Sequence, residues 1–315
     1  MRREAALEWE SRWALPVAMA TVLAIVLIVA SRIVNEASGD GTAELLRSVD
    51  AHSGSVTLAG VLQAIAFALL AFPFAYLFRA AAARSERVRG QLIGLVVIAP
   101  LFLGASAGLA VVAQQEAADQ FLAGDAKSTL TAKEAKEECV EERQDDGNDH
   151  LVDEYDPAKG ESPLQACETR KVEDDEASNA RTEASLAGIV TGLGIAGALG
   201  FVVALFYTCL WAMRTGLLTR FWGSLGMALG VATLLGLLPF LLIWLLYIAL
   251  LVVGKVPGGR PPAWAAGEAI PWPTPGEKAA AELEPEDGWE ESGTPDSEGD
   301  GEGESGPKRK RKQRE

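Results

Sequence analysis

Three groups of residues in this chain have types or spacings that could support chemistry, and the first is a serine motif. Gly104-Ala-Ser106-Ala-Gly108 matches the G-x-S-x-G pattern in which serine hydrolases present their nucleophile. The match lies inside a long apolar run, and the two histidines, His52 and His150, lie outside such runs, so no base is placed to activate the serine. We interpret Ser106 as a small residue at a helix interface, and the sequence predicts neither a catalytic site nor an enzyme.

The second group is an acidic stretch, residues 145–156, whose carboxylates could ligate calcium. An EF-hand loop needs oxygen donors at alternate positions, glycine at the sixth position and glutamate at the twelfth. Gly147 comes too early for Asp145 or Asp146 to be the first ligand. The stretch is therefore interpreted as a solvated loop, and no metal or other cofactor is predicted.

The third group is the cysteines, which number three and are too few for a zinc cluster or a cysteine-rich scaffold. Cys139 and Cys167 flank the acidic stretch, in a segment that the arginine pattern below places outside the cytoplasm, where disulfides persist. A disulfide here would stabilise the fold by about 3–4 kcal/mol, and two unpaired thiols are the alternative. Cys209 lies in an apolar run and is interpreted as a small packed hydrophobe.

Apolar and acidic blocks must position these residues. The chain has 315 residues, is 49% hydrophobic and carries a net charge of −15, so the two kinds of residue have to be segregated. A helix needs about 20 apolar residues to cross the hydrocarbon of a bilayer. Four long runs therefore predict spans at about residues 13–33, 55–78, 91–113 and 185–213.

A further apolar run, from Phe221 to Gly254, contains no charged residue. It is too long for one upright helix, and Pro239 predicts a break that gives short spans at about 221–236 and 238–254. One steeply tilted helix is the alternative. The predicted fold class is all-α, a polytopic membrane protein with about six transmembrane helices.

Arginines predict the orientation of these spans. The loop after the second span and the link after the fourth are rich in arginine, at Arg79, Arg84, Arg87, Arg89, Arg214 and Arg220. Short loops of this kind stay in the cytoplasm. The first apolar run is longer than the core of a signal peptide, so it is counted as an uncleaved span. Six crossings then give a multi-pass plasma-membrane protein with both termini in the cytoplasm.

The chain is expected to divide into four parts. Residues 1–113 form an N-terminal membrane part, residues 114–184 an acidic extracytoplasmic helical hairpin, residues 185–255 a C-terminal membrane part, and residues 256–315 a disordered cytoplasmic tail. The limbs of the hairpin are rich in helix formers and are predicted to continue spans three and four. Leu45, Leu46 and Val49 share one face of a short amphipathic helix expected at the outer surface.

Glycines recur at the four-residue spacing that lets transmembrane helices approach closely. The candidate helix-packing residues are Gly104, Gly108, Gly188, Gly192, Gly226 and Gly230. Packing within one chain is the expected use, and the spacing does not distinguish it from dimerisation, so no oligomeric state is predicted.

The chain ends in a basic cluster made of Lys308, Arg309, Lys310, Arg311 and Lys312. Such a cluster can contact anionic lipid, at about 1 kcal/mol per residue near the surface. A solvated end is the alternative, because the neighbouring acidic block competes for the same charges. Nucleic acid is not expected as a partner.

Two stretches point to a family. Residues from Tyr207 to Val231 read YTCLWAMRTGLLTRFWGSLGMALGV, and those from Gly258 to Pro273 read GGRPPAWAAGEAIPWP. They resemble a family of uncharacterised multi-pass membrane proteins of high-GC Gram-positive (actinobacterial) bacteria. The resemblance implies an arrangement of spans, brings no activity with it, and does not extend to the acidic segment.

The expected function follows from where the polar residues lie. The spans carry no ionisable residue that would mark a transport path or a catalytic centre. We therefore expect a non-enzymatic interaction or structural protein of the membrane, whose partners are the lipid bilayer and a protein bound through the outer hairpin or the tail. A transporter or channel for a small or hydrophobic substrate is the alternative.

Overall fold

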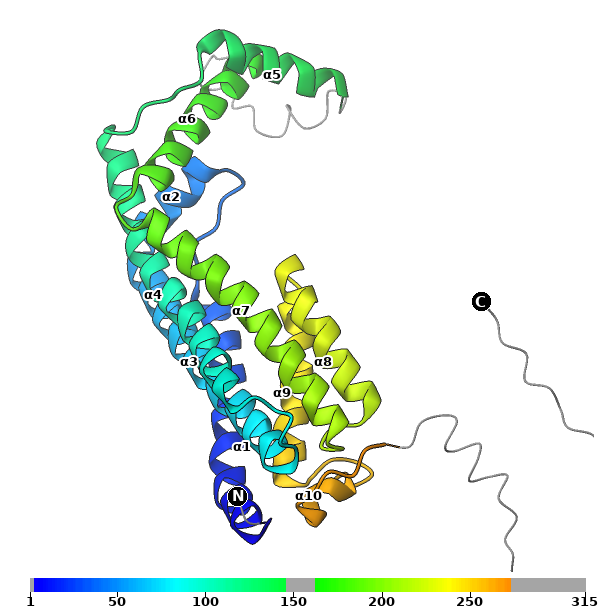
Figure 1. Ribbon diagram of the computed structural model, residues 1–315. Helices are drawn as coiled ribbons and strands as arrows, with labels where there is room; N and C mark the ends of the chain where they lie inside the picture. Colours follow the sequence, from blue (N-terminus) through cyan, green and yellow to red (C-terminus); the bar gives the residue numbers. More distant parts are fainter. Residues whose placement is uncertain (1–2, 146–161, 273–315) are drawn as a thin grey trace, which may run out of the picture. The chain divides into compact units, whose positions relative to one another are not determined.

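The computed structural model describes residues 3–145 and 162–272, and the regular structure in these residues is helical (Figure 1). Four helices are long and apolar enough to cross a membrane, as expected of a membrane protein: α1 (Arg3–Val34), α3 (Ser53–Arg84), α4 (Ile93–Ala123) and α7 (Ala187–Arg214). The remaining elements are α2 (Thr42–Ala51), α5 (Ala132–Asp145), α6 (Pro163–Glu183), α8 (Arg220–Ala232), α9 (Leu238–Val253), α10 (Pro262–Ala266) and the 3-10 turns η1 (Gly90–Leu92) and η3 (Thr233–Leu235).

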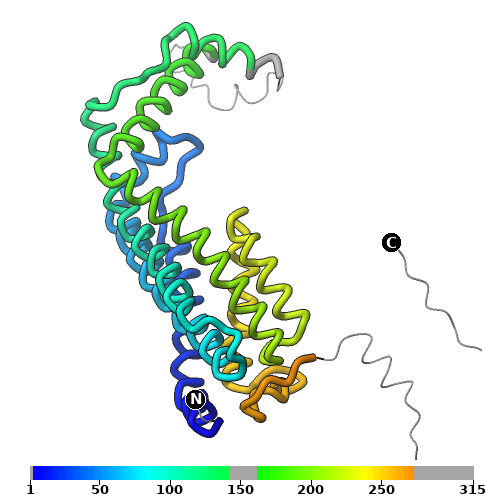
Figure 2. The backbone as a smooth tube through the Cα atoms, in the orientation of Figure 1, coloured from blue at the N-terminus to red at the C-terminus, as the bar shows by residue number. Residues whose placement is uncertain are grey.

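The long helices pack side by side as the chain doubles back on itself (Figure 2). Helix α3 contacts α1 and α4, and α4 contacts α7, while the shorter α9 packs on α1 and α8 packs on α7. We call one end of these helices the basic end, because it carries Arg79, Arg84, Arg87, Arg89, Arg214 and Arg220. The opposite end, which carries α2, α5 and α6, is called the acidic end.

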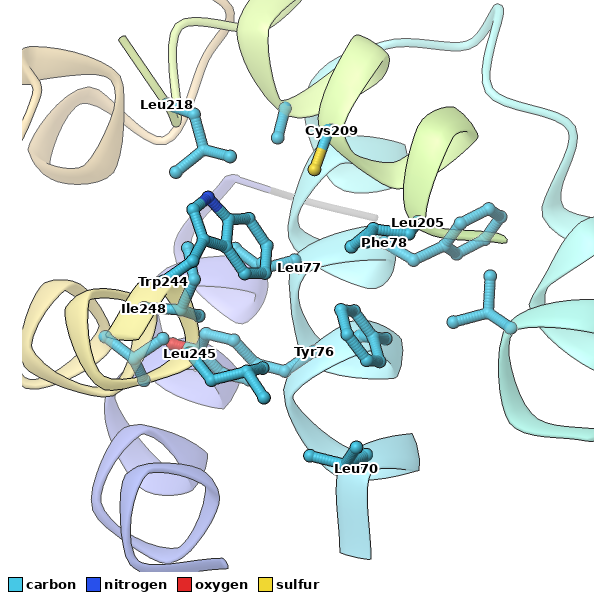
Figure 3. Packing of buried hydrophobic residues seen from close by; sticks show 14 of the residues in the cluster. Leu70, Tyr76, Leu77, Phe78, Leu205, Cys209, Leu218, Trp244, Leu245 and Ile248 are labelled. Atoms are coloured by element: carbon cyan, nitrogen blue, oxygen red, sulfur yellow. The ribbon is translucent and has the colours of Figure 1, made fainter. Parts of the chain in front are cut away.

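A core of aliphatic and aromatic side chains lies between α1, α3, α4, α7, α8 and α9, and Figure 3 shows part of it. Trp244 is fully buried in it, and its indole N–H donates to the carbonyl oxygen of Trp222 at 2.9 Å. The ring of Phe74 lies 6.4 Å from the Trp244 ring. Cys209 is fully buried in the same core, as predicted for a small packed hydrophobe.

Two predicted glycine pairs lie where another helix comes close. A Cβ on Gly104 would lie 2.7 Å from the carbonyl oxygen of Ala64 in α3, and one on Gly108 would lie 3.6 Å from the Ala64 Cβ. A Cβ on Gly226 would lie 2.6 Å from the Trp244 ring, and one on Gly230 would lie 3.0 Å from a Leu205 methyl group. These approaches are the ones that residues without a side chain permit.

The third pair, Gly188 and Gly192, does not pack, because nothing lies within 4 Å of a Cβ at either position. Helix α7 instead meets α4 at Gly197 and Gly200, where a Cβ would lie 2.9 Å from the Leu103 amide nitrogen and 3.1 Å from the Ala99 Cβ. The five residues from Gly192 to Gly197 turn the helix by about 140° beyond one full turn. The predicted glycines are therefore on the wrong face.

Residues 220–253 form two helices rather than one. Helix α8 continues through η3 and ends at Gly236, whose φ of 77° is left-handed, and α9 begins at Leu238 with Pro239 in its first turn. Glycine adopts a left-handed conformation without steric cost, and proline fits a first turn because its missing N–H has no partner there. The predicted break near Pro239 is thus confirmed.

The two limbs predicted between spans three and four were expected to continue those spans as unbroken helices, and in the structure both are interrupted. Helix α4 runs ten residues past the predicted span and then stops at Gly124, whose φ is 74°. Residues 124–131 have no helical structure, so α5 is a separate helix, and α6 ends at Glu183, before α7 begins. Helix propensity predicted the helices but not these breaks, which depend on tertiary contacts.

The prediction of a disordered tail from residue 256 is wrong for residues 256–272. This segment includes α10, and Trp264 within it is only 4% exposed. We call residues 256–272 the closing segment. The part of the predicted tail that starts at residue 273 lies outside the described residues.

Two glycines give a matched test of this packing. Gly104→Ala places a methyl group against the backbone of α3, and we expect it to destabilise the protein by about 1–3 kcal/mol. Gly192→Ala meets open space, and the better helix propensity of alanine should leave stability unchanged or raised by up to about 1 kcal/mol. Thermal unfolding in detergent micelles, followed by circular dichroism, measures both. Equal midpoints for the two variants would contradict the close approach of α4 and α3.

Candidate functional site

The acidic end is built around α6, whose carboxylates hold the neighbouring helix. The Ala43 amide of α2 donates to Asp174 Oδ1 at 2.9 Å, across 131 residues of sequence. Gly41, at the N-cap of α2, makes no capping bond of its own, and its missing side chain leaves room for this carboxylate. An anion at a helix N-terminus is stabilised by unpaired N–H groups and by the helix dipole. Asp174 therefore caps α2 from a distant helix.

A second contact between α2 and α6 is the ion pair of Arg47 Nη2 with Glu173 Oε2, 2.7 Å apart. The same guanidinium lies 5.4 Å from the Phe121 ring of α4. Leu46 and Val49 are buried beneath it, so the helix predicted from their pattern is present, and its apolar face packs against protein. Three helices, α2, α4 and α6, thus share one small core at the acidic end.

Asp175 holds the link between α4 and α5. Its Oδ2 accepts hydrogen bonds from the Ser128 hydroxyl at 2.8 Å and from the amides of Thr129 and Leu130 at 2.6 and 3.1 Å. Partial burial raises the pKa of the Asp175 carboxyl, but these hydrogen bonds together lower it below its ordinary value. A lowered pKa means that the stabilisation is present above about pH 4, the pKa of an unfolded aspartate, and is lost as the pH falls through the folded value.

The structure joins Cys139 of α5 to Cys167 of α6 by a disulfide, with their Cα atoms 6.1 Å apart. In α5 up to Glu141, the part whose burial the structure describes, Ala135 and Cys139 are buried and lie one turn apart, so this part rests on α6 along a single narrow face. Lys171 and Glu138 lie 3.7 Å apart beside the disulfide. The other side of α5 is exposed and acidic, with Glu134, Glu137 and Glu141.

The basic end contains a buried ion pair that sequence reasoning missed. Glu10 of α1 and Arg84 of α3 form a two-point salt bridge, and the side chains are only 6% and 1% exposed. Arg84 also donates to the carbonyl oxygens of Ala80 at 2.9 Å and Ala263 at 3.1 Å. Each residue lies outside an apolar run, and no local pattern signals their pairing across 74 residues.

Aromatic rings surround this ion pair. The Tyr76 hydroxyl donates to the Glu10 carbonyl oxygen at 3.0 Å, and its ring stacks between those of Trp9 and Trp264. The Arg84 guanidinium lies 5.6 Å from the Trp264 ring, within cation–π range. The rings exclude water from the pair, which strengthens its electrostatic attraction.

The closing segment is held to the link between α7 and α8 by three hydrogen bonds. The indole N–H groups of Trp264 and Trp272 donate to the carbonyl oxygens of Leu217 and Leu218, at 3.0 and 2.9 Å. The Ile270 amide donates to the Thr215 carbonyl oxygen at 3.2 Å. These contacts explain why a stretch rich in proline and glycine is ordered.

Gly216 shows how close this approach is. Its φ of 76° is left-handed, and a Cβ there would collide with the carbonyl oxygen of Ile270. Only glycine meets both requirements without strain. The closing segment and the loop at residues 214–220 are therefore fitted to each other.

The remaining predicted positions form no common site. The Ser106 hydroxyl donates to the Val190 carbonyl oxygen of α7 at 2.9 Å, so it links two helices, as its interpretation as an interface residue requires. The basic cluster at residues 308–312 and most of the acidic stretch, residues 146–161, lie outside the described residues. Among the described residues, histidine, cysteine and acidic side chains form no group of three that could hold a metal ion.

Comparison of the chain with protein-family models, with curated proteins and with solved structures finds no match. The resemblance to actinobacterial membrane proteins therefore stays an expectation from the sequence.

The buried ion pair gives a prediction about stability. Arg84→Met leaves the Glu10 carboxylate buried and unpaired, and we expect a loss of about 3–5 kcal/mol. The double variant Glu10→Gln, Arg84→Met removes both charges and should recover part of that loss. Arg87→Met, at an exposed position of the same end, is the matched control and should change stability by less than about 0.5 kcal/mol.

Thermal unfolding in detergent micelles measures these variants. Equal midpoints for Arg84→Met and Arg87→Met would show that the pair does not hold the basic end together. With Glu10→Gln alone measured as well, a double variant as unstable as the sum of the two single variants would show that the two charges do not interact.

Proposed function

We propose that this chain is a six-span protein of the plasma membrane, with both termini in the cytoplasm and α2, α5 and α6 outside. Four long apolar helices support membrane insertion. The arginines of the basic end favour a cytoplasmic position for that end. The turn at Gly236 supports two further short crossings by α8 and α9, because it returns the chain to the end at which α8 began.

We further propose that the protein works by interaction rather than by catalysis. The observation that carries this proposal is the construction of the acidic end, where a disulfide and two structural aspartates hold three helices in place. Such cross-linking preorganises a surface, which lowers the entropy that binding would otherwise cost. The partner is a protein, bound through the exposed face of α5.

The exposed face of α5 has a charge that fits a basic partner. By sequence α5 has six carboxylates and three basic residues, a net charge of −3. Glu134, Glu137 and Glu141 are exposed on it with Lys133 and Lys136. Complementary charge speeds association and selects among partners more than it adds affinity. We therefore expect a moderate affinity that weakens as salt is added.

Transport is the second candidate function. The buried hydroxyl groups of α1 count against it. Thr21 and Ser31 donate to carbonyl oxygens of their own helix, those of Val17 and Ile28, both at 2.8 Å. Hydroxyls bonded in this way are satisfied within their own helix and need no water from a hydrated pathway. This supports the interaction role.

Thiol labelling in intact cells tests the orientation. A membrane-impermeant maleimide should label Cys139 and Cys167 only after reduction, because both are bridged and outside. Cys209 is fully buried and should stay unlabelled. Labelling before reduction would contradict the disulfide. Because Cys139 and Cys167 are themselves buried, the external position is contradicted only if the reduced cysteines are labelled in permeabilised cells and not in intact ones.

A fusion reporter tests the other end of the chain. A reporter that is active only outside the cytoplasm, fused after Trp272 so that the closing segment is kept, should be silent. An active fusion there would mean that α8 and α9 do not make two crossings.

Photo-crosslinking in native membranes tests the interaction. A photoreactive amino acid at Glu137, which is 67% exposed, should give one discrete protein adduct that declines at high salt. The control is the same amino acid at Leu15 of α1, which is 60% exposed on the apolar surface, and it should give no such adduct. Absence of an adduct at Glu137, or the same adduct at both positions, would contradict a partner on α5.

A further inference from the structure

A groove of about 400 Å³ opens between α1, α3 and α4 towards the basic end. Its floor is the face of α3 that carries Ala68, Ala71 and Ala75, and its walls include Trp13 of α1 and Leu101 of α4. Small residues on α3 between large ones on its neighbours leave this space unfilled. The volume falls within the range of about 300–1,000 Å³ that is typical of ligand sites.

The groove lies on the apolar surface of the long helices. Trp13, Phe72 and Leu101, which line it, are 42%, 48% and 43% exposed. Large apolar side chains exposed in this way face hydrocarbon in a membrane protein. An occupant of the groove must therefore be apolar along most of its length.

One charged group lies among the lining residues, the guanidinium of Arg79. It lies 4.6 Å from the centre of the Trp9 ring, and Trp9 stacks on Tyr76. Among the described residues, Arg79 forms no ion pair with a carboxylate, unlike Arg84 about one turn and a half further on. A guanidinium held against a ring keeps its N–H donors directed at a phosphate or carboxylate.

We propose that this groove binds an anionic phospholipid, with the phosphate on Arg79 and an acyl chain over the alanines of α3. The combination of an apolar groove, interfacial tryptophans and one unpaired arginine at the basic end matches the two chemical parts of such a lipid. The proposal rests on the membrane insertion proposed above and goes beyond the interaction role of α5.

Tryptophan quenching by brominated lipids tests the site, because Trp9 and Trp13 line the groove. A Trp9→Phe, Trp13→Phe variant gives the quenching of the other six tryptophans, which is subtracted. The full chain is reconstituted in phosphatidylcholine vesicles that contain increasing fractions of brominated phosphatidylglycerol or brominated phosphatidylcholine. Half-maximal quenching should require about five-fold less of the anionic lipid, which is the factor that corresponds to about 1 kcal/mol for one arginine near the surface.

Three variants separate the parts of the site. Arg79→Gln should abolish the preference for the anionic lipid, and Arg89→Gln, at an exposed position of the same end, should keep it. Ala75→Phe fills the floor of the groove and should reduce quenching by both lipids. Glycerol phosphate in the buffer should not compete, because it lacks an acyl chain.

Each other result overturns an identifiable claim. A preference that survives Arg79→Gln, or that glycerol phosphate removes, would overturn the lipid site. If Ala75→Phe instead changes the oligomeric state measured by light scattering, a second copy of the chain covers the groove and the proposal is wrong. Absence of quenching by either lipid in the unmodified chain would contradict membrane insertion itself, and with it the proposed function.

Discussion

The fold at the basic end depends on one interaction, the ion pair of Glu10 with Arg84. Two charges removed from water cost several kcal/mol each, and only a close partner with further hydrogen bonds offsets this cost. Arg84 meets the requirement by also donating to the carbonyl oxygens of Ala80 and Ala263. Its side chain therefore joins the start of α1, the end of α3 and the closing segment. Few other sets of acceptors would bond to all of these N–H groups of the Arg84 guanidinium at once.

The two ends of the helices differ in their main contacts, although one arginine of the acidic end, Arg47, also lies against a ring. At the acidic end, Asp174 and Asp175 accept hydrogen bonds from backbone amides and hydroxyls, so the carboxylates serve as helix caps and loop supports. At the basic end, arginines lie against aromatic rings, as Arg84 and Arg260 do against Trp264. Aromatic rings and guanidinium groups suit the interface between water and lipid, whereas capped helices with a disulfide suit an aqueous, oxidising surface. This difference agrees with the orientation that we propose.

Most of the helices could be predicted from the sequence, because hydropathy acts over windows of about 20 residues and needs no tertiary information. Gly236 and Pro239 also marked their turn, since their backbone preferences are local. The faces of the helices could not be predicted in the same way. Gly188 and Gly192 have the right spacing, but which face of α7 meets α4 depends on the neighbouring helix.

The candidate sites also divide into those that local sequence could predict and those that depend on tertiary contacts. Cys139 and Cys167 could be proposed as a pair because only one pairing was available in the outer segment, whereas the pairing of Glu10 with Arg84 has many rivals in a chain of this charge. Order in the closing segment was missed because its stability comes from Leu217 and Leu218, which lie some 50 residues earlier. Its composition indicates that the segment cannot build a hydrophobic core of its own. Composition does not show that the segment can pack on a core formed by the rest of the protein.

The place of Ala263 in the chain has a consequence for how the protein is made. Arg84 emerges from the ribosome 179 residues before the carbonyl group that completes its coordination. At about 5–20 residues per second, this interval is on the order of ten to forty seconds. During that time the Arg84 guanidinium lacks the Ala263 carbonyl oxygen and the Trp264 ring. The basic end can therefore be completed only after α9 and the closing segment have been made, so a chain that stops before Ala263 lacks one acceptor of its buried arginine.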